Sequence, residues 1–127
     1  MGAVAGPNII VLMLTAMEHD LQYRINYKMD TSMMLSMRSI FLGTQKSSIL
    51  QQMSQVDSEK NKARYNQLAA MLQQIEARER QIAALEKQLE MEMKALENQL
   101  KKVQQRKEGA QKMLDQNIKG AFDYGQG

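Results

Sequence analysis

The sequence contains one side chain suited to proton transfer near neutral pH, His19, and it lies between two carboxylates, Glu18 and Asp20. A metal site would need such ligands to converge on one point, but consecutive residues of a helix point to different faces. Nucleophilic catalysis needs a nucleophile, a base and an orienting group, and the chain has no cysteine. We therefore expect no metal, no cofactor and no enzymatic activity.

Two other patterns could bind or process a small molecule. The glutamates Glu86, Glu90 and Glu92 are closely spaced, but a solvated helix face explains them more simply than an acid–base pair. The glycines of residues 2–6 are not followed by the Lys and Ser or Thr that complete a phosphate-binding loop. No small-molecule substrate is expected.

The second half of the chain carries a basic cluster around one acid, Glu108. The bases are Lys101, Lys102, Arg106, Lys107 and Lys112. Such a cluster could contact phosphates, but it is short and has no interleaved aromatic residues. Bases near the C-terminus of a helix also interact favourably with its dipole. Nucleic acid is therefore not an expected partner.

The apolar run 9–14 is too short to cross a bilayer, and no Lys or Arg precedes it as in a secretory signal. Its flanks are not basic, so binding to a membrane surface is not expected. We expect no transmembrane segment, and a protein that is cytoplasmic or exported without a cleaved signal peptide.

Composition predicts the elements that position these residues. The 127 residues suffice for one domain, and the only proline is Pro7. Leu, Met, Gln, Lys, Glu and Ala dominate, as in long helices and coiled coils, and no stretch alternates with a period of two. The sequence therefore predicts an all-α fold.

Heptad spacing is the most specific pattern in the sequence. Every seventh residue from Leu68 to Ala110 is apolar, and a second apolar series recurs four residues further on, which predicts a coiled coil of two or more helices. The predicted seam consists of Leu68, Leu72, Ile75, Ile82, Leu89, Met93, Leu96, Leu100, Val103 and Leu114. Glu79, Glu86 and Lys107 interrupt it and restrict its register.

Capping signals divide the chain into segments of one domain. The predicted segments are a flexible N-terminus at 1–8, an apolar Met-rich helix at 9–42, a turn at 43–48, a long coiled-coil helix at 49–117 and a glycine-aromatic tail at 118–127. Gly43 would cap the first helix. The polar run 57–61 is an alternative turn, preceded by a short helix at 49–56.

The first helix presents an apolar ladder with a spacing of four residues. Its members are Met17, Leu21, Ile25, Met29, Met33, Met37 and Phe41. Each step drifts about 40° on a 3.6-residue helix, so the stripe winds round the helix and one straight partner cannot cover it. These residues, with Phe122 and Tyr124 of the tail, are the candidate partner-binding residues.

These segments predict a helical hairpin whose second helix is about twice as long as its first. The seam beyond residue 85 would then lack a partner within the chain, which favours oligomerisation. We expect a non-enzymatic structural or interaction protein that pairs with itself, with another helical protein, or with both. Two alternatives are a subunit of a secretion-type filament or secreted helical protein, and an export chaperone or adaptor that binds a partner through the Met-rich helix.

The arrangement resembles small, uncharacterised bacterial coiled-coil proteins. The resemblance is carried by the segment Leu14 to Leu21, by the Gln/Glu/Lys/Leu-rich stretch from Gln73 to Gln105, and by the end of the chain from Asn117 to Phe122. It implies a helical plan and no activity. The plan is also similar to hairpin subunits of secretion filaments, but the Trp-x-Gly turn of one secreted helical family is missing because the chain has no Trp.

Overall fold

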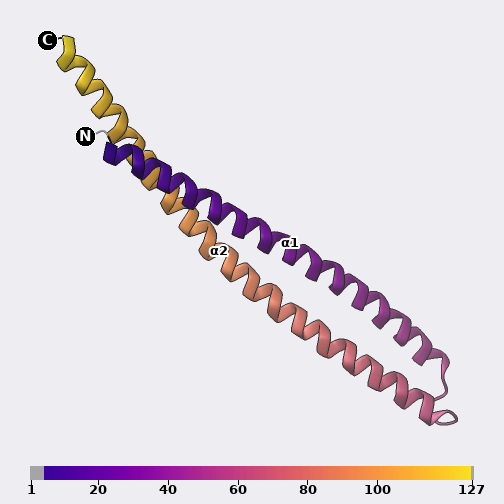
Figure 1. Ribbon diagram of the computed structural model, residues 1–127. Coiled ribbons are helices and arrows are strands. Elements are labelled where there is room, and N and C mark those ends of the chain that lie inside the picture. The colour runs from indigo at the N-terminus through magenta and orange to yellow at the C-terminus, as the bar shows by residue number, and fades with distance from the viewer. Residues whose placement is uncertain (1–4, 127) are drawn as a thin grey trace. The chain divides into compact units, whose positions relative to one another are not determined.

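The computed structural model describes the backbone of residues 5–126 and the side chains of residues 8–120. Helix α1, Ala5–Gln55, and helix α2, Lys62–Gln126, are joined by a short turn and pack as a hairpin (Figure 1). No strand occurs within residues 5–126. The prediction of an all-α helical hairpin is confirmed.

The turn lies between residues 56 and 61. Asp57 starts it, because its Oδ1 accepts hydrogen bonds from the backbone N–H groups of Glu59, at 2.9 Å, and Lys60, at 3.2 Å. Asn61 then caps α2, with its Oδ1 3.4 Å from the backbone nitrogen of Arg64. The polar run 57–61 is therefore the turn, and the preferred prediction of a turn at 43–48 is wrong.

Helix α1 continues through residues 43–48 because packing outweighs the local turn signal. Leu42 and Ile49, on either side of that segment, are buried against α2. A helical Gly43 costs only about 1 kcal/mol relative to Ala, and a Cβ added there would meet no atom within 4 Å. Burial of two large side chains contributes more than that, so the helix is maintained.

The two ends of the helices also differ from the prediction. Helix α1 begins at Ala5, so Pro7 lies in its first turn, where the missing N–H costs nothing. Helix α2 continues past Asn117 and through Gly120 to Gln126. Isolated glycines weaken a helix by about 1 kcal/mol each and do not end it without a competing cap. The predicted boundaries at 9 and 117 are therefore wrong.

The chain forms two packed units, each containing one segment of both helices. The first consists of residues 5–28 with residues 92–126, and its core contains Leu14, Leu21, Val103 and Ala110. Val11, Leu96 and Leu100 pack against that core. In this unit α2 runs on past the first turn of α1 (Figure 1).

The second unit is Met29–Met91, which contains the turn. Its core consists of Leu42 and Ile49 of α1 with Leu68 and Ile75 of α2. Met53, Val56, Leu72 and Ile82 pack against it. Leu68 is the most deeply buried large side chain of the described residues, with 1% of its surface exposed.

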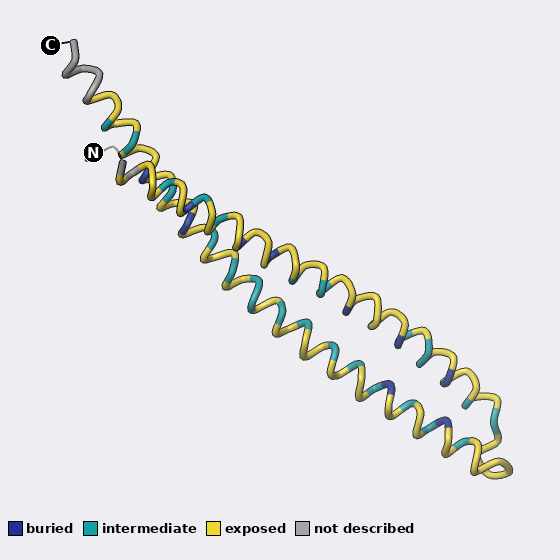
Figure 2. The backbone as a smooth tube through the Cα atoms, in the orientation of Figure 1, coloured by how far each residue is buried: buried dark blue, intermediate teal, exposed yellow. Residues whose placement is uncertain are grey.

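Helix α1 carries a heptad of its own that the sequence analysis did not identify. Five of the six residues buried in its described part recur every seven residues, except where Lys28 takes one step, at Leu14, Leu21, Leu35, Leu42 and Ile49; the sixth, Ile25, lies four residues after Leu21. Figure 2 shows these buried positions recurring between longer exposed stretches of α1. The seam of α2 is therefore covered by α1 of the same chain, which has 51 residues against the 65 of α2.

Candidate functional site

The predicted seam of α2 faces α1 in both units. Three of its positions are buried, Leu68, Ile75 and Val103, as is Ala110 beside them. The others are half-buried, namely Leu72, Ile82, Leu89, Met93, Leu96, Leu100 and Leu114. The argument that the seam beyond residue 85 lacks a partner is wrong, because Leu96, Leu100 and Val103 pack with Val11, Leu14 and Leu21 of α1.

The predicted partner-binding ladder divides between two faces of α1. Leu21 and Ile25 are buried, with 7% and 3% of their surface exposed, so they contact the hairpin and are not available to a partner. The remaining members within the described residues are exposed, namely Met17, Met29, Met33, Met37 and Phe41. The side chains of Phe122 and Tyr124 lie outside the described residues.

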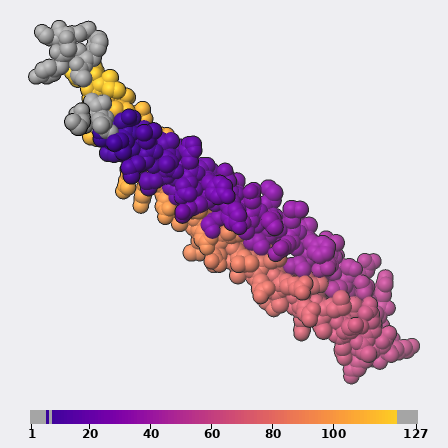
Figure 3. Space-filling view, viewed as in Figure 1, coloured from indigo at the N-terminus to yellow at the C-terminus, as the bar shows by residue number. Residues whose placement is uncertain are grey.

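Exposed apolar residues occur along α1 in both units, and one group of them lies on its outer face in the unit Met29–Met91. We define the methionine face as Met33, Met34, Met37, Ile40 and Phe41, which are 57–70% exposed. Their spacing places them on one side of the helix, opposite the buried Leu35 and Leu42. The corresponding middle turns of α1 are uncovered in Figure 3. Sequence analysis missed Met34 and Ile40, because they lie off the four-residue ladder.

Two of the charged residues that interrupt the heptads of α2, Glu79 and Lys107, pair with side chains of α1. In the first unit Lys107 Nζ lies 3.5 Å from Glu18 Oε2. In the second unit Lys46 Nζ lies 3.4 Å from Glu79 Oε1 and 3.8 Å from Glu76 Oε1. Each pair joins one side chain from each helix, so a helix shifted in register would lose them.

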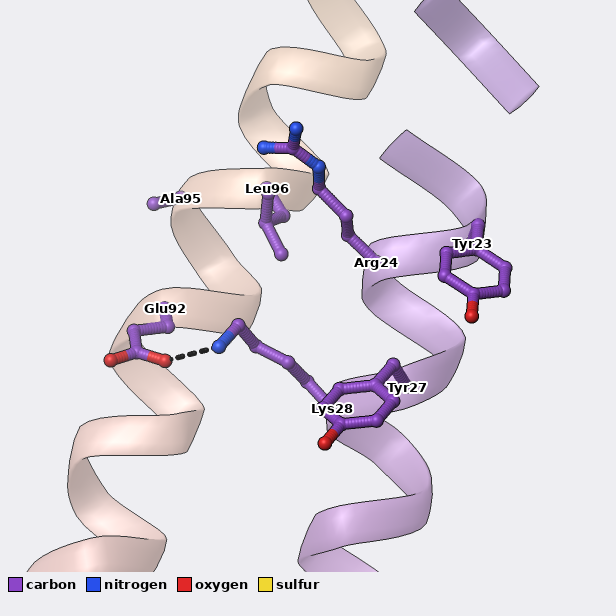
Figure 4. Close-up of a pocket in the computed structure, with 7 residues that line it drawn as sticks. All are labelled: Tyr23, Arg24, Tyr27, Lys28, Glu92, Ala95 and Leu96. Atoms are coloured by element: carbon purple, nitrogen blue, oxygen red, sulfur yellow. Dashed lines mark hydrogen bonds and ion pairs between the residues drawn. The ribbon is translucent and has the colours of Figure 1, made fainter. Parts of the chain in front are cut away.

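A groove in the first unit brings together the most varied set of side chains (Figure 4). It has a volume of about 610 Å³, and its α1 wall carries Tyr23, Arg24, Tyr27 and Lys28. Lys28 reaches across to Glu92 of α2, and both are only partly exposed. Arg24 is paired with Asp20 one turn earlier, at 3.1 Å. The cations of this groove are therefore already engaged, which leaves it little capacity to bind an anion.

The other residues weighed for chemistry do not assemble into a site. His19 is exposed, and no group of three or more His, Cys, Asp or Glu side chains comes together in the part of the chain that the structure describes. In the basic cluster, Lys107 pairs with Glu18 and Lys112 lies 3.9 Å from Glu108.

Two further findings bear on the class of protein. Within the described residues neither helix contains a stretch long and apolar enough to span a bilayer. Comparison with protein-family models, with curated proteins and with solved structures finds no match for this chain.

Proposed function

We propose that the chain is a non-enzymatic interaction protein that self-associates through the methionine face of α1. The observation that carries this proposal is the double character of α1 in the unit Met29–Met91. One side of the helix packs on α2 through Leu35 and Leu42, while the other exposes five large apolar side chains. A helix that is apolar on opposite sides is typical of one packed between two neighbours.

The occupant that fits the methionine face best is the same face of a second copy. Its five positions carry no charge, so two copies meet without repulsion between like charges. Methionine side chains are flexible and polarizable, so identical surfaces can adapt to each other. Pairing of one face with itself also gives a closed dimer, whereas a secretion-type filament would need two different surfaces.

The magnitude of this association follows from the exposed area. Burial of the remaining surface of the five side chains on both copies would contribute roughly 9–18 kcal/mol. Association costs about 4–15 kcal/mol in lost freedom. The balance is small, so we expect a reversible dimer with a dissociation constant in the range of roughly micromolar to millimolar.

Molar mass measured by light scattering over a hundredfold range of concentration tests the proposal. The mass should rise from one chain towards two and then level off. The double variant Met33→Gln/Met37→Gln should remain a monomer at the highest concentration, because glutamine keeps the helix and removes the apolar contact. The matched control is Met91→Gln/Met113→Gln, which changes two exposed methionines of α2 and should dimerise normally.

Two outcomes would contradict this proposal. If the Met33→Gln/Met37→Gln variant associates as strongly as the natural sequence, the methionine face is not the interface. If the mass increases without a limit, the filament alternative replaces the closed dimer.

A further inference from the structure

A second groove lies between the helices in the unit Met29–Met91. Its volume is about 420 Å³. Leu35 and Leu42 of α1 and Ile82 of α2 line its depth, and all three are buried or half-buried. Two further lining residues, Phe41 and Leu85, are 62% and 48% exposed. The groove therefore leaves an apolar strip accessible along the hairpin.

One arginine from each helix lines this groove, Arg38 from α1 and Arg78 from α2. Both are exposed, and neither makes an ion pair or a hydrogen bond with any residue of the described part of the chain. No Asp or Glu lines the groove. By contrast, Lys46 of the same unit is held by Glu76 and Glu79. The two guanidinium groups thus give the groove a positive charge without a counter-charge.

We propose that this groove binds an acidic amphipathic helix of a partner protein. The apolar strip would take the leucine-type side chains that such a helix presents every three or four residues. Carboxylates on the edges of the bound helix would accept paired hydrogen bonds from Arg38 and Arg78, a geometry that the planar guanidinium favours. Because the arginines come from opposite walls, a helix with acidic residues on both sides of its apolar stripe is the complementary partner.

The neighbouring surfaces do not supply this occupant. The methionine face of a second copy has no carboxylate among its five positions, so it does not complement the arginines. In the groove of Figure 4, Lys28 pairs with Glu92 and Arg24 pairs with Asp20. That groove therefore lacks the uncompensated positive charge that Arg38 and Arg78 give to this one. The inference rests on the groove alone and does not depend on self-association.

Fluorescence anisotropy with two peptides tests the inference on the full chain, at a concentration where light scattering gives a monomer. The probe is a fluorescein-labelled peptide of about three heptads, with leucine at a and d and glutamate at e and g. Repulsion between its glutamates prevents the peptide from pairing with itself. It should bind saturably and more weakly at high salt, whereas the same peptide with lysine at e and g should not bind.

Variants locate the binding to the groove. Arg38→Gln/Arg78→Gln should weaken binding of the acidic peptide by about tenfold or more, because both charge-assisted contacts are lost. The matched control Arg80→Gln/Lys87→Gln removes two exposed bases of α2 outside the groove, and should bind within about twofold of the natural chain. Circular dichroism of each variant confirms that the helices are intact.

Three results would overturn the inference. Equal binding of the acidic and basic peptides would show that charge does not select the partner, and unchanged binding by Arg38→Gln/Arg78→Gln would show that the groove is not the site. The third result is that the acidic peptide does not bind, whereas the natural chain binds vesicles of phosphatidylglycerol and phosphatidylcholine. If Arg38→Gln/Arg78→Gln abolishes that vesicle binding, the arginines bind an anionic lipid. Phe41 belongs both to this groove and to the methionine face, but the arginine variants leave it unchanged, so none of these results decides whether the proposed dimer forms.

Discussion

Lys107 of α2 lies 3.5 Å from Glu18 of α1, measured from Nζ to Oε2, although the two residues are 89 positions apart. Their side chains are only 30% and 26% exposed, because both occupy heptad positions that face the other helix. Lys107, a charge that interrupts the apolar seam of α2, therefore meets an opposite charge from α1 of the same chain. We infer that this pair selects the register of the hairpin.

Reversal of the charge at Glu18 tests this pair. Glu18→Lys places a second cation beside Lys107, and should lower the free energy of unfolding by about 1 kcal/mol at low salt. The double variant Glu18→Lys/Lys107→Glu should recover most of that loss, because attraction is restored with the signs exchanged. Urea unfolding of the natural chain, the single variants Glu18→Lys and Lys107→Glu, and the double variant measures both effects.

The exposed pair Glu108 and Lys112 provides the comparison for this cycle. Both of its side chains are at least 70% exposed, so exchange of its charges should change stability little. Failure of the Glu18 and Lys107 exchange to recover stability would mean that the contact does not select the register.

Substitution of Gly43 tests whether residues 43–48 form part of a helix or a turn. Within a continuous α1, Gly43→Ala should raise the free energy of unfolding by about 0.5–1 kcal/mol, since a Cβ there meets no atom within 4 Å. Gly109→Ala is the matched change in the interior of α2 and should act in the same direction. Thermal unfolding checks both. If Gly43→Ala lowers the free energy of unfolding while Gly109→Ala raises it, the turn lies at 43–48 and the continuous α1 is contradicted.

Leu68 tests where the core of the unit Met29–Met91 lies. It is 1% exposed, and Leu68→Ala should lower the free energy of unfolding by about 2–4 kcal/mol through lost burial and a residual cavity. Leu85 is 48% exposed, so Leu85→Ala should cost less than about 1 kcal/mol. Chemical denaturation of both variants gives the comparison, and equal losses would contradict the assigned core.

The heptads of α2 predicted its inner face, because apolar residues seven apart stand out among Gln, Glu and Lys. The equivalent heptad of α1 could not be recognised in the same way. Leu35 and Leu42 belong to it, but Met33, Met34 and Met37 beside them are equally apolar and face outwards. On a helix that is apolar on two sides, hydrophobicity alone does not tell which side faces the partner.

The turn was misplaced for a different reason. Gly43 followed by polar residues matches a helix end, but its cost in a helix is small and the flanking Leu42 and Ile49 are buried. Asp57 holds the turn through two backbone N–H groups, and it was weighed only as an alternative. A turn at 43–48 shortens the first helix, and the seam beyond residue 85 then lacks a partner within the chain.

The groove with Arg38 and Arg78 could not have been predicted from either helix alone. The two arginines are 40 positions apart in the sequence, and only the pairing of the helices places them on one groove. Unpaired arginines are also common on helix surfaces, so neither carries a signal by itself.

The central claim is that α1 covers the heptad seam of α2 within one chain. Leu14 and Ala110 lie in one core cluster, four residues before Glu18 and three after Lys107. The chain has no native cysteine, so Leu14→Cys/Ala110→Cys introduces a single possible pair. Oxidation at nanomolar concentration should give a monomer closed by a disulfide, which mass spectrometry detects after digestion. Disulfide-linked dimers without that closed monomer would mean that the seam pairs between chains, and would contradict the account.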